Sequence, residues 1–168
     1  MATSAEPTAV ETPPGSAWLW SLRVYLGVIL IGNIVWETLH LPLYTIWRTG
    51  TVREQAFAVF HCTLGDVLIA LSALTLALLL FADHTWPARR FRRVAGTAIA
   101  FGIGYTIFSE WLNVVVRASW AYSDWMPVVR LFGHDIGLSP LLQWMVVPGA
   151  AFGLISRLTH CQVAKPPP

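Results

Sequence analysis

Charged residues are scarce in this chain, at only 12% of its 168 residues. A soluble domain carries roughly 25%. A surface with so few charges cannot face water on all sides, which excludes an ordinary cytosolic globule. The net charge is only +2, which excludes a nucleic-acid binder, because that function needs a clustered basic face.

The common catalytic motifs are missing as well. The chain contains no G-x-S-x-G, Walker loop, H-E-x-x-H or C-x-x-C sequence. These motifs mark α/β-hydrolases, nucleotide-binding loops, zinc proteases and dithiol sites. No reaction can therefore be named from a motif in this sequence.

Apolar residues, by contrast, are abundant. They make up 55% of the chain, the mean hydropathy is +0.58, and nine residues are Trp, which is enriched at membrane interfaces. A spanning helix needs roughly 20 apolar residues, and four such runs cover 18–47, 54–81, 94–116 and 139–158. We predict an all-α, polytopic membrane protein whose single domain, 18–160, is a four-transmembrane-helix bundle.

The segments outside the four runs have a different composition. Residues 1–17 and 161–168 lack an apolar period and are predicted to be disordered tails. The connection 117–138 holds several Trp, Tyr and Phe residues, so we predict an interfacial or re-entrant aromatic segment across one mouth of the bundle.

Proline positions add local expectations. Pro42 and Pro148 lie inside apolar runs and predict helix kinks, because proline cannot donate the backbone hydrogen bond. Ser139 and Pro140 are typical of the N-cap and first position of a helix.

Arginine clusters indicate the orientation in the membrane. With four spans, both chain ends and the second connection share one side, and that connection contains ARRFRR at 88–93. Basic residues stay on the cytoplasmic side. We therefore predict cytoplasmic termini, with the first and third connections outside.

Polar side chains inside the predicted spans gather at one depth. At about 1.5 Å per residue they lie roughly 6 to 14 Å from the outer ends. The set is Glu37, His40, His61, Asp66, Glu110 and Gln143. Because such residues are costly in a membrane and mark functional sites, we predict a polar pocket that opens outward.

One chemistry that would use this pocket is metal binding. A carboxylate and a His three residues apart, such as Glu37 and His40, form the ligand pair found in four-helix di-iron sites. A mononuclear zinc or iron site would use Glu37, His40, His61 and Asp66. His61 and Asp66 are about 140° apart around a helix, so both reach one ion only if that helix is distorted.

The other chemistry is proton transfer to a small hydrophobic molecule, isoprenoid-like or lipid-like, that arrives from the bilayer. A carboxyl group in apolar surroundings can hold a proton and donate it. The predicted catalytic residues are Glu37, His40, His61 and Glu110. The predicted ligand-binding residues are Asp66, Asn113, Arg117, Trp120, Tyr122, Trp125 and Gln143.

A non-catalytic role stays open beside these two. The polar groups would then satisfy one another, with Glu110 paired to Arg117 or a His and with Asn113 and Gln143 bonded across helices. Such a core suits a membrane subunit that docks on a partner protein or on a second copy of itself.

Four stretches carry a resemblance to known families. They are WETLHLPLYTIW (36–47), FHCTLGDVLIA (60–70), EWLNVVVRASWAYSDWMPVV (110–129) and GLSPLLQWMVVPG (137–149). Together they resemble small four-span bacterial membrane proteins without an assigned activity, which implies a multi-pass protein of the bacterial inner membrane.

Two further resemblances concern the ligand. The Glu110 region is similar in rhythm to membrane carotenoid-biosynthesis hydratases, which have an intramembrane Glu followed by a Tyr-rich loop. Glu37 with HLPLY, and then His61, resembles the EXPERA fold of emopamil-binding protein and the sigma-2 receptor, which binds sterols through acidic residues and His. Both resemblances imply an isoprenoid-like ligand rather than an ion.

Overall fold

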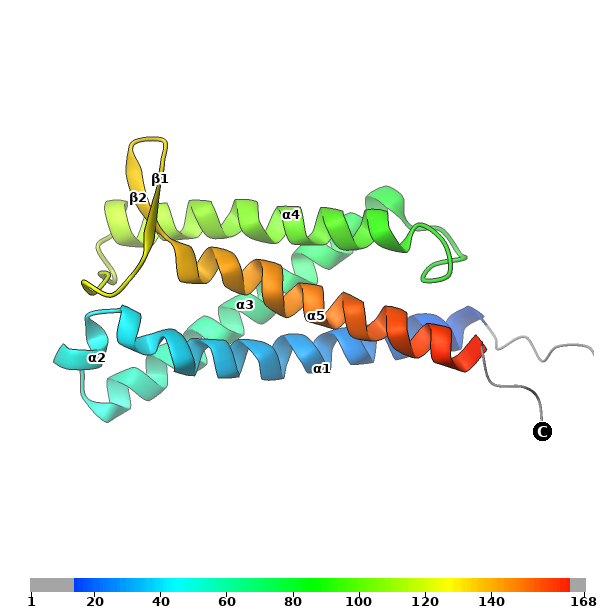
Figure 1. Cartoon of the computed structure of the whole chain (residues 1–168), viewed down its shortest axis with the longest axis horizontal. Helices are drawn as coiled ribbons and strands as arrows, with labels where there is room; N and C mark the ends of the chain where they lie inside the picture. Colours follow the sequence, from blue (N-terminus) through cyan, green and yellow to red (C-terminus); the bar gives the residue numbers. More distant parts are fainter. Residues whose placement is uncertain (1–13, 164–168) are drawn as a thin grey trace, which may run out of the picture.

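The computed structural model describes residues 14–163, and its main elements are long helices (Figure 1). These are α1 (Pro14–His40), α3 (Val52–Phe81), α4 (Phe91–Glu110) and α5 (Leu138–Val163), with a short α2 (Ile46–Thr49). Four helical segments of the described chain are long and apolar enough to cross a membrane. The predicted fold class is confirmed: the protein is a multi-pass membrane protein built on a four-helix bundle.

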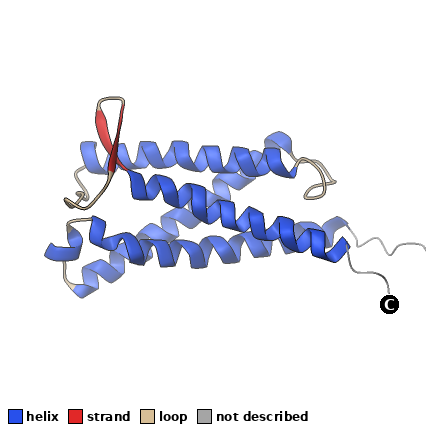
Figure 2. Cartoon of the chain, in the orientation of Figure 1, coloured by secondary structure: helices blue, strands red, loops and turns tan. Residues whose placement is uncertain are grey.

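The two ends of the bundle differ, as Figure 2 shows. At one end, α2 and a two-stranded antiparallel hairpin of β1 (Val128–Leu131) and β2 (His134–Gly137) lie together; we call this the hairpin end. At the opposite end, which we call the terminal end, lie the start of α1, the end of α5 and the connection between α3 and α4 (Figure 1).

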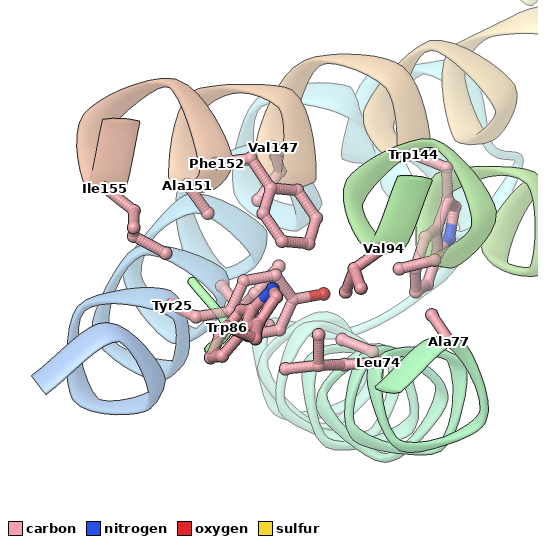
Figure 3. Close-up of a cluster of buried hydrophobic side chains, with 13 residues drawn as sticks. Tyr25, Leu74, Ala77, Trp86, Val94, Trp144, Val147, Ala151, Phe152 and Ile155 are labelled. Atoms are coloured by element: carbon pink, nitrogen blue, oxygen red, sulfur yellow. The ribbon is translucent and has the colours of Figure 1, made fainter. Parts of the chain in front are cut away.

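The apolar core joins the four long helices (Figure 3). Tyr25 of α1 contacts Phe152 of α5 with ring centroids 5.1 Å apart, and Leu74 of α3 belongs to the same buried cluster as Val94 of α4. The second half of α3 is thus packed against the first half of α4. Their other halves, toward the hairpin end, contribute little to this core.

A glycine sets the closest approach of α4 to α5. A Cβ atom built on Gly102 would lie 1.9 Å from Cε3 of the Trp144 ring. Small residues at helix contacts allow this kind of packing, which replaces the hydrophobic effect as the main attraction between helices in lipid. Trp144 is itself 3% exposed, so the ring has little room to move.

The first span ends earlier than expected. We predicted a kinked helix over 18–47, but α1 stops at His40 and is followed by a 3₁₀ turn, Leu41–Leu43, and then by α2. Pro42 explains the break, because it lacks an N–H and disfavours helical geometry in the residue before it. Pro148, by contrast, lies within α5, which continues past it.

The aromatic connection between α4 and α5 is partly a hairpin, which the sequence did not predict. Phe132 and Gly133 form its turn with φ angles of 50° and 83°, values that suit glycine best. Before the hairpin, the chain is bonded to the break after α1: the Thr45 N–H donates to the Ala121 carbonyl at 2.9 Å, and the Ser123 N–H to the Leu43 carbonyl at 2.9 Å. The connection is therefore anchored across the hairpin end.

Other element boundaries shift by a few residues. Helix α1 already begins at Pro14, inside the predicted tail 1–17, and residues 1–13 lie outside the described part of the chain. Helix α3 begins at Val52 rather than at 54, because Thr51 and Glu54 form a capping box. The third span continues from α4 into a π-helix, η2 (Trp111–Val116).

The contact between Gly102 and Trp144 generates a stability prediction. We expect Gly102→Ala to lower the free energy of unfolding by about 1–3 kcal/mol, the usual cost of overpacking a tight contact. Gly96→Ala on the same helix is the control, since a Cβ there meets nothing within 4 Å. Unfolding in mixed detergent and SDS micelles measures both, and equal stabilities of the two variants would contradict this packing.

Candidate functional site

Glu37 and His40 form the centre of a buried network at the hairpin end. The Nε2 atom of His40 lies 3.1 Å from Oε2 of Glu37, and its Nδ1 lies 3.1 Å from the Ser139 hydroxyl. The Trp36 indole N–H donates to that hydroxyl at 3.2 Å. With Glu37 ionised, Nε2–H donates to the carboxylate and Nδ1 accepts from Ser139, so every partner of the imidazole is satisfied.

Gln143 of α5 connects this pair to α3. Its Nε2 atom lies 3.0 Å from Oδ1 of Asn33, 3.0 Å from Oε1 of Glu37 and 2.9 Å from Oδ2 of Asp66. The amide group has two hydrogens, and three acceptors surround it. A further proton on one of the two carboxyl groups would complete this set, so the arrangement is suited to holding a transferable proton.

A third carboxyl group, that of Glu110, is held by the aromatic connection. The Tyr122 hydroxyl donates to Oε2 of Glu110 at 2.5 Å, and the Gly137 N–H donates to the same hydroxyl at 2.8 Å. Burial, and then the nearby Glu110 carboxylate, raise the pKa of Tyr122 above its ordinary value. The phenol therefore remains a hydrogen-bond donor at every physiological pH.

A large cavity lies beside the carboxyl groups of Glu37, Asp66 and Glu110. Its volume is about 1680 Å³, and its wall is formed by α3 and α4 with the end of α1 and the start of α5. Leu68 and Leu76 of α3 and Phe101 of α4 line the cavity and are exposed. The cavity therefore opens sideways between α3 and α4, where the first half of α3 is not packed against the core.

This cavity brings together most of the residues predicted from the sequence. Those that line it are Glu37, His40, His61, Asp66, Glu110, Asn113, Arg117, Trp120 and Gln143. Tyr122 is joined to the site through Glu110. Trp125 does not line the cavity: it is 58% exposed, and the Arg48 guanidinium lies over its ring, 4.8 Å from the centroid.

Glu110, Asn113 and Arg117 all line the cavity, but the predicted pairing of Glu110 with Arg117 does not form. The Asn113 amide donates to the Ser109 carbonyl of its own helix at 2.9 Å, and Arg117 is exposed and does not pair with Glu110. The π-helix η2 lies between Glu110 and Arg117, and its wider turns change the rotation of one residue relative to the other.

The predicted metal ligands are only partly gathered. Within residues 14–163, no three His, Cys, Asp or Glu side chains are grouped so that they could hold a metal ion. Asp66 turns toward Gln143, while His61 is exposed and stacks on Phe57 with ring centroids 5.6 Å apart. The spacing of His61 and Asp66 around a regular helix explains why they diverge.

The sequence analysis missed several members of the network. Asn33 lies one helical turn before Glu37, so its place in the stripe of Glu37 and His40 was a readable signal. The sequence predicts Ser139 as an N-cap, whereas α5 begins at Leu138 and the Ser139 side chain lies within hydrogen-bond distance of His40. Tyr44 lines the cavity edge-on to His40, with ring centroids 5.3 Å apart, and no spacing pointed to it.

Comparisons of this chain with models of known families, with curated proteins and with solved structures find no match. The resemblances seen in the sequence therefore stay expectations. The site has to be interpreted from its own geometry.

The Gln143 network generates a prediction for stability. Gln143→Met keeps the length of the side chain but removes the donor for Asn33, Glu37 and Asp66. We expect it to lower the free energy of unfolding by about 1–3 kcal/mol, the cost of leaving buried acceptors unpaired.

Asn113→Leu provides the matched control, because the Asn113 amide bonds only to Ser109 within its own turn. Its loss should stay near 0.6 kcal/mol or below, about the average for a polar contact within a membrane. Unfolding of both variants in mixed micelles tests the difference, and a Gln143→Met protein as stable as the parent would contradict the network.

Proposed function

We propose that this protein binds a small hydrophobic molecule, isoprenoid-like or lipid-like, that enters from the bilayer, and that its buried carboxyl and imidazole groups transfer protons to and from it. One observation carries the proposal: a single cavity is lined both by exposed apolar side chains of α3 and α4 and by Glu37, His40 and Asp66. Such a cavity suits a ligand that travels in lipid and is handled by polar groups.

The position of the opening supports entry from the membrane. Leu68 and Phe101 flank it on opposite helices and would face acyl chains. The volume of about 1680 Å³ exceeds the roughly 300–1,000 Å³ of usual ligand pockets. A lipid-sized ligand would occupy it.

The hydrogen bonds around Glu37 support proton transfer. His40 and Gln143 both donate to its carboxylate, and Asp66 is the third group around the same amide. A proton taken from the ligand by Glu37 or Asp66 could move along Glu37 and His40, since each is already within hydrogen-bond distance of the next. Glu110, held by Tyr122, supplies a third carboxyl group, on the α4 side.

The rival proposal is a structural role in a larger membrane complex. Glu37 already hydrogen-bonds to His40 and Gln143, and this favours the structural role. The cavity favours ligand binding instead, because a purely structural network needs no open space beside it.

We further propose that the protein resides in the inner membrane of a bacterium, as the family resemblance implies, with both termini in the cytoplasm. The support for this orientation is the set of arginines in and beside the α3–α4 connection at the terminal end, Arg89, Arg90, Arg92 and Arg93. The hairpin end would then face outward.

The copurified molecule tests the proposed chemistry. The protein is purified in native nanodiscs from cells and incubated in D₂O, and the extracted lipids are returned to ordinary water before mass spectrometry. We expect one lipid to be enriched over the bulk membrane and to carry carbon-bound deuterium.

Glu37→Gln should retain the enriched lipid but lose the deuterium, because the amide cannot accept the proton. Asp135→Asn is the matched control, since Asp135 is exposed and does not line the cavity, and it should behave as the parent. An unchanged lipid profile would contradict binding, and an enriched lipid without deuterium would contradict proton transfer.

The orientation has a separate test. Alkaline phosphatase, which is active only outside the cytoplasm, is fused after Val163 in one variant and inserted at Gly133 in another. We expect activity only from the Gly133 insertion, and activity only from the Val163 fusion would reverse the orientation.

A further inference from the structure

The hydrogen-bonding groups that line the cavity are unevenly satisfied. The carboxyl groups of Glu37, Asp66 and Glu110 already accept from His40, Gln143 and Tyr122. Among the described residues at the cavity, the Thr106 hydroxyl has no hydrogen-bond partner, and Arg53 and Arg117 form no ion pair. These groups can donate to a ligand that accepts hydrogen bonds.

Thr106 is the most buried of these groups. It is 5% exposed, it lines the cavity, and its hydroxyl has no partner among the described residues. A Thr in a helix can usually donate to the carbonyl four residues earlier, so an unbonded buried hydroxyl is unusual.

Two arginines stand at the hairpin end of the same cavity. Arg53 comes from the first turn of α3, and Arg117 follows η2. In the described part of the chain neither takes part in an ion pair. A guanidinium group presents a fork of donors that matches phosphate and carboxylate oxygens.

The cavity is also elongated and becomes apolar away from these arginines. On α3 its lining runs from Arg53 to Leu76, a length of roughly 35 Å along the helix at about 1.5 Å per residue. Near the far limit the lining includes Leu76, Ala100 and Phe101. One end suits a negative head and the other suits a hydrocarbon chain.

We propose that the ligand is an anionic single-chain amphiphile whose phosphate or carboxylate head is bound between Arg53 and Arg117 and whose chain lies between α3 and α4. This inference rests on the proposed function and names the class of ligand. With the head group there, the part of the hydrocarbon chain next to it would lie beside Glu37, His40 and Asp66.

The test measures binding of three probes of equal chain length by native mass spectrometry of the full chain released from detergent. The probes are hexadecyl phosphate, palmitate and the neutral hexadecanol. We expect at least one anionic probe to bind about tenfold more tightly than hexadecanol, and the stronger of the two identifies the head group.

Arg53→Gln with Arg117→Gln should remove this preference and leave hexadecanol binding unchanged, and both arginines are exposed, so the fold should persist. The double Lys variant at these positions should restore part of the preference. Arg92→Gln with Arg93→Gln, at the terminal end, is the control and should bind like the parent.

Equal binding of all three probes would overturn the anionic head while leaving the proposed cavity binding intact. Loss of preference in the Arg92 and Arg93 control would show attraction to general surface charge and would also overturn it. If no probe binds, the proposed function fails together with this inference.

Discussion

The Gln143 amide is the contact on which the polar half of this bundle depends. Carboxyl groups inside a membrane-spanning segment need hydrogen-bond partners from other helices, because lipid supplies none. One amide on α5 lies within hydrogen-bond distance of Asn33 and Glu37 of α1 and of Asp66 of α3. At the hairpin end, this amide takes the place that apolar packing occupies at the terminal end.

The division between the two ends explains why a cavity exists. At the terminal end, Leu74, Val94 and Phe152 fill the space between helices. Toward the hairpin end, α3 leaves α4 and is attached to the rest of the bundle through Asp66 and the short α2 segment. The loss of apolar packing on the face of α3 toward α4 costs stability. Hydrogen bonds on the other face of α3 compensate for this loss, and the side toward α4 stays open.

Sequence patterns predicted the architecture well, because membrane spans are set by length and hydropathy. The depth of the polar residues was also readable, and the structure gathers Glu37, His40, Asp66 and Gln143 at one end as expected. The rotation of each helix about its own axis was harder to predict from the sequence. Neither the π-helix at Trp111–Val116 nor the inward role of Ser139 has a spacing signal, since both depend on contacts between distant segments.

The path of the aromatic connection could not be predicted from the sequence either, and this path affects the site. Its composition indicated a segment across the mouth of the bundle, but its path is set by backbone bonds from Thr45 to Ala121 and from Ser123 to Leu43. These bonds exist because Pro42 ends α1 and frees the backbone that follows. The same break places His40 at the last turn of α1, beside the cavity and next to Ser139. A straight first span would have moved Tyr44 and the connection away from Glu110. The proline that interrupts the helix therefore allows Tyr122 to hydrogen-bond to Glu110.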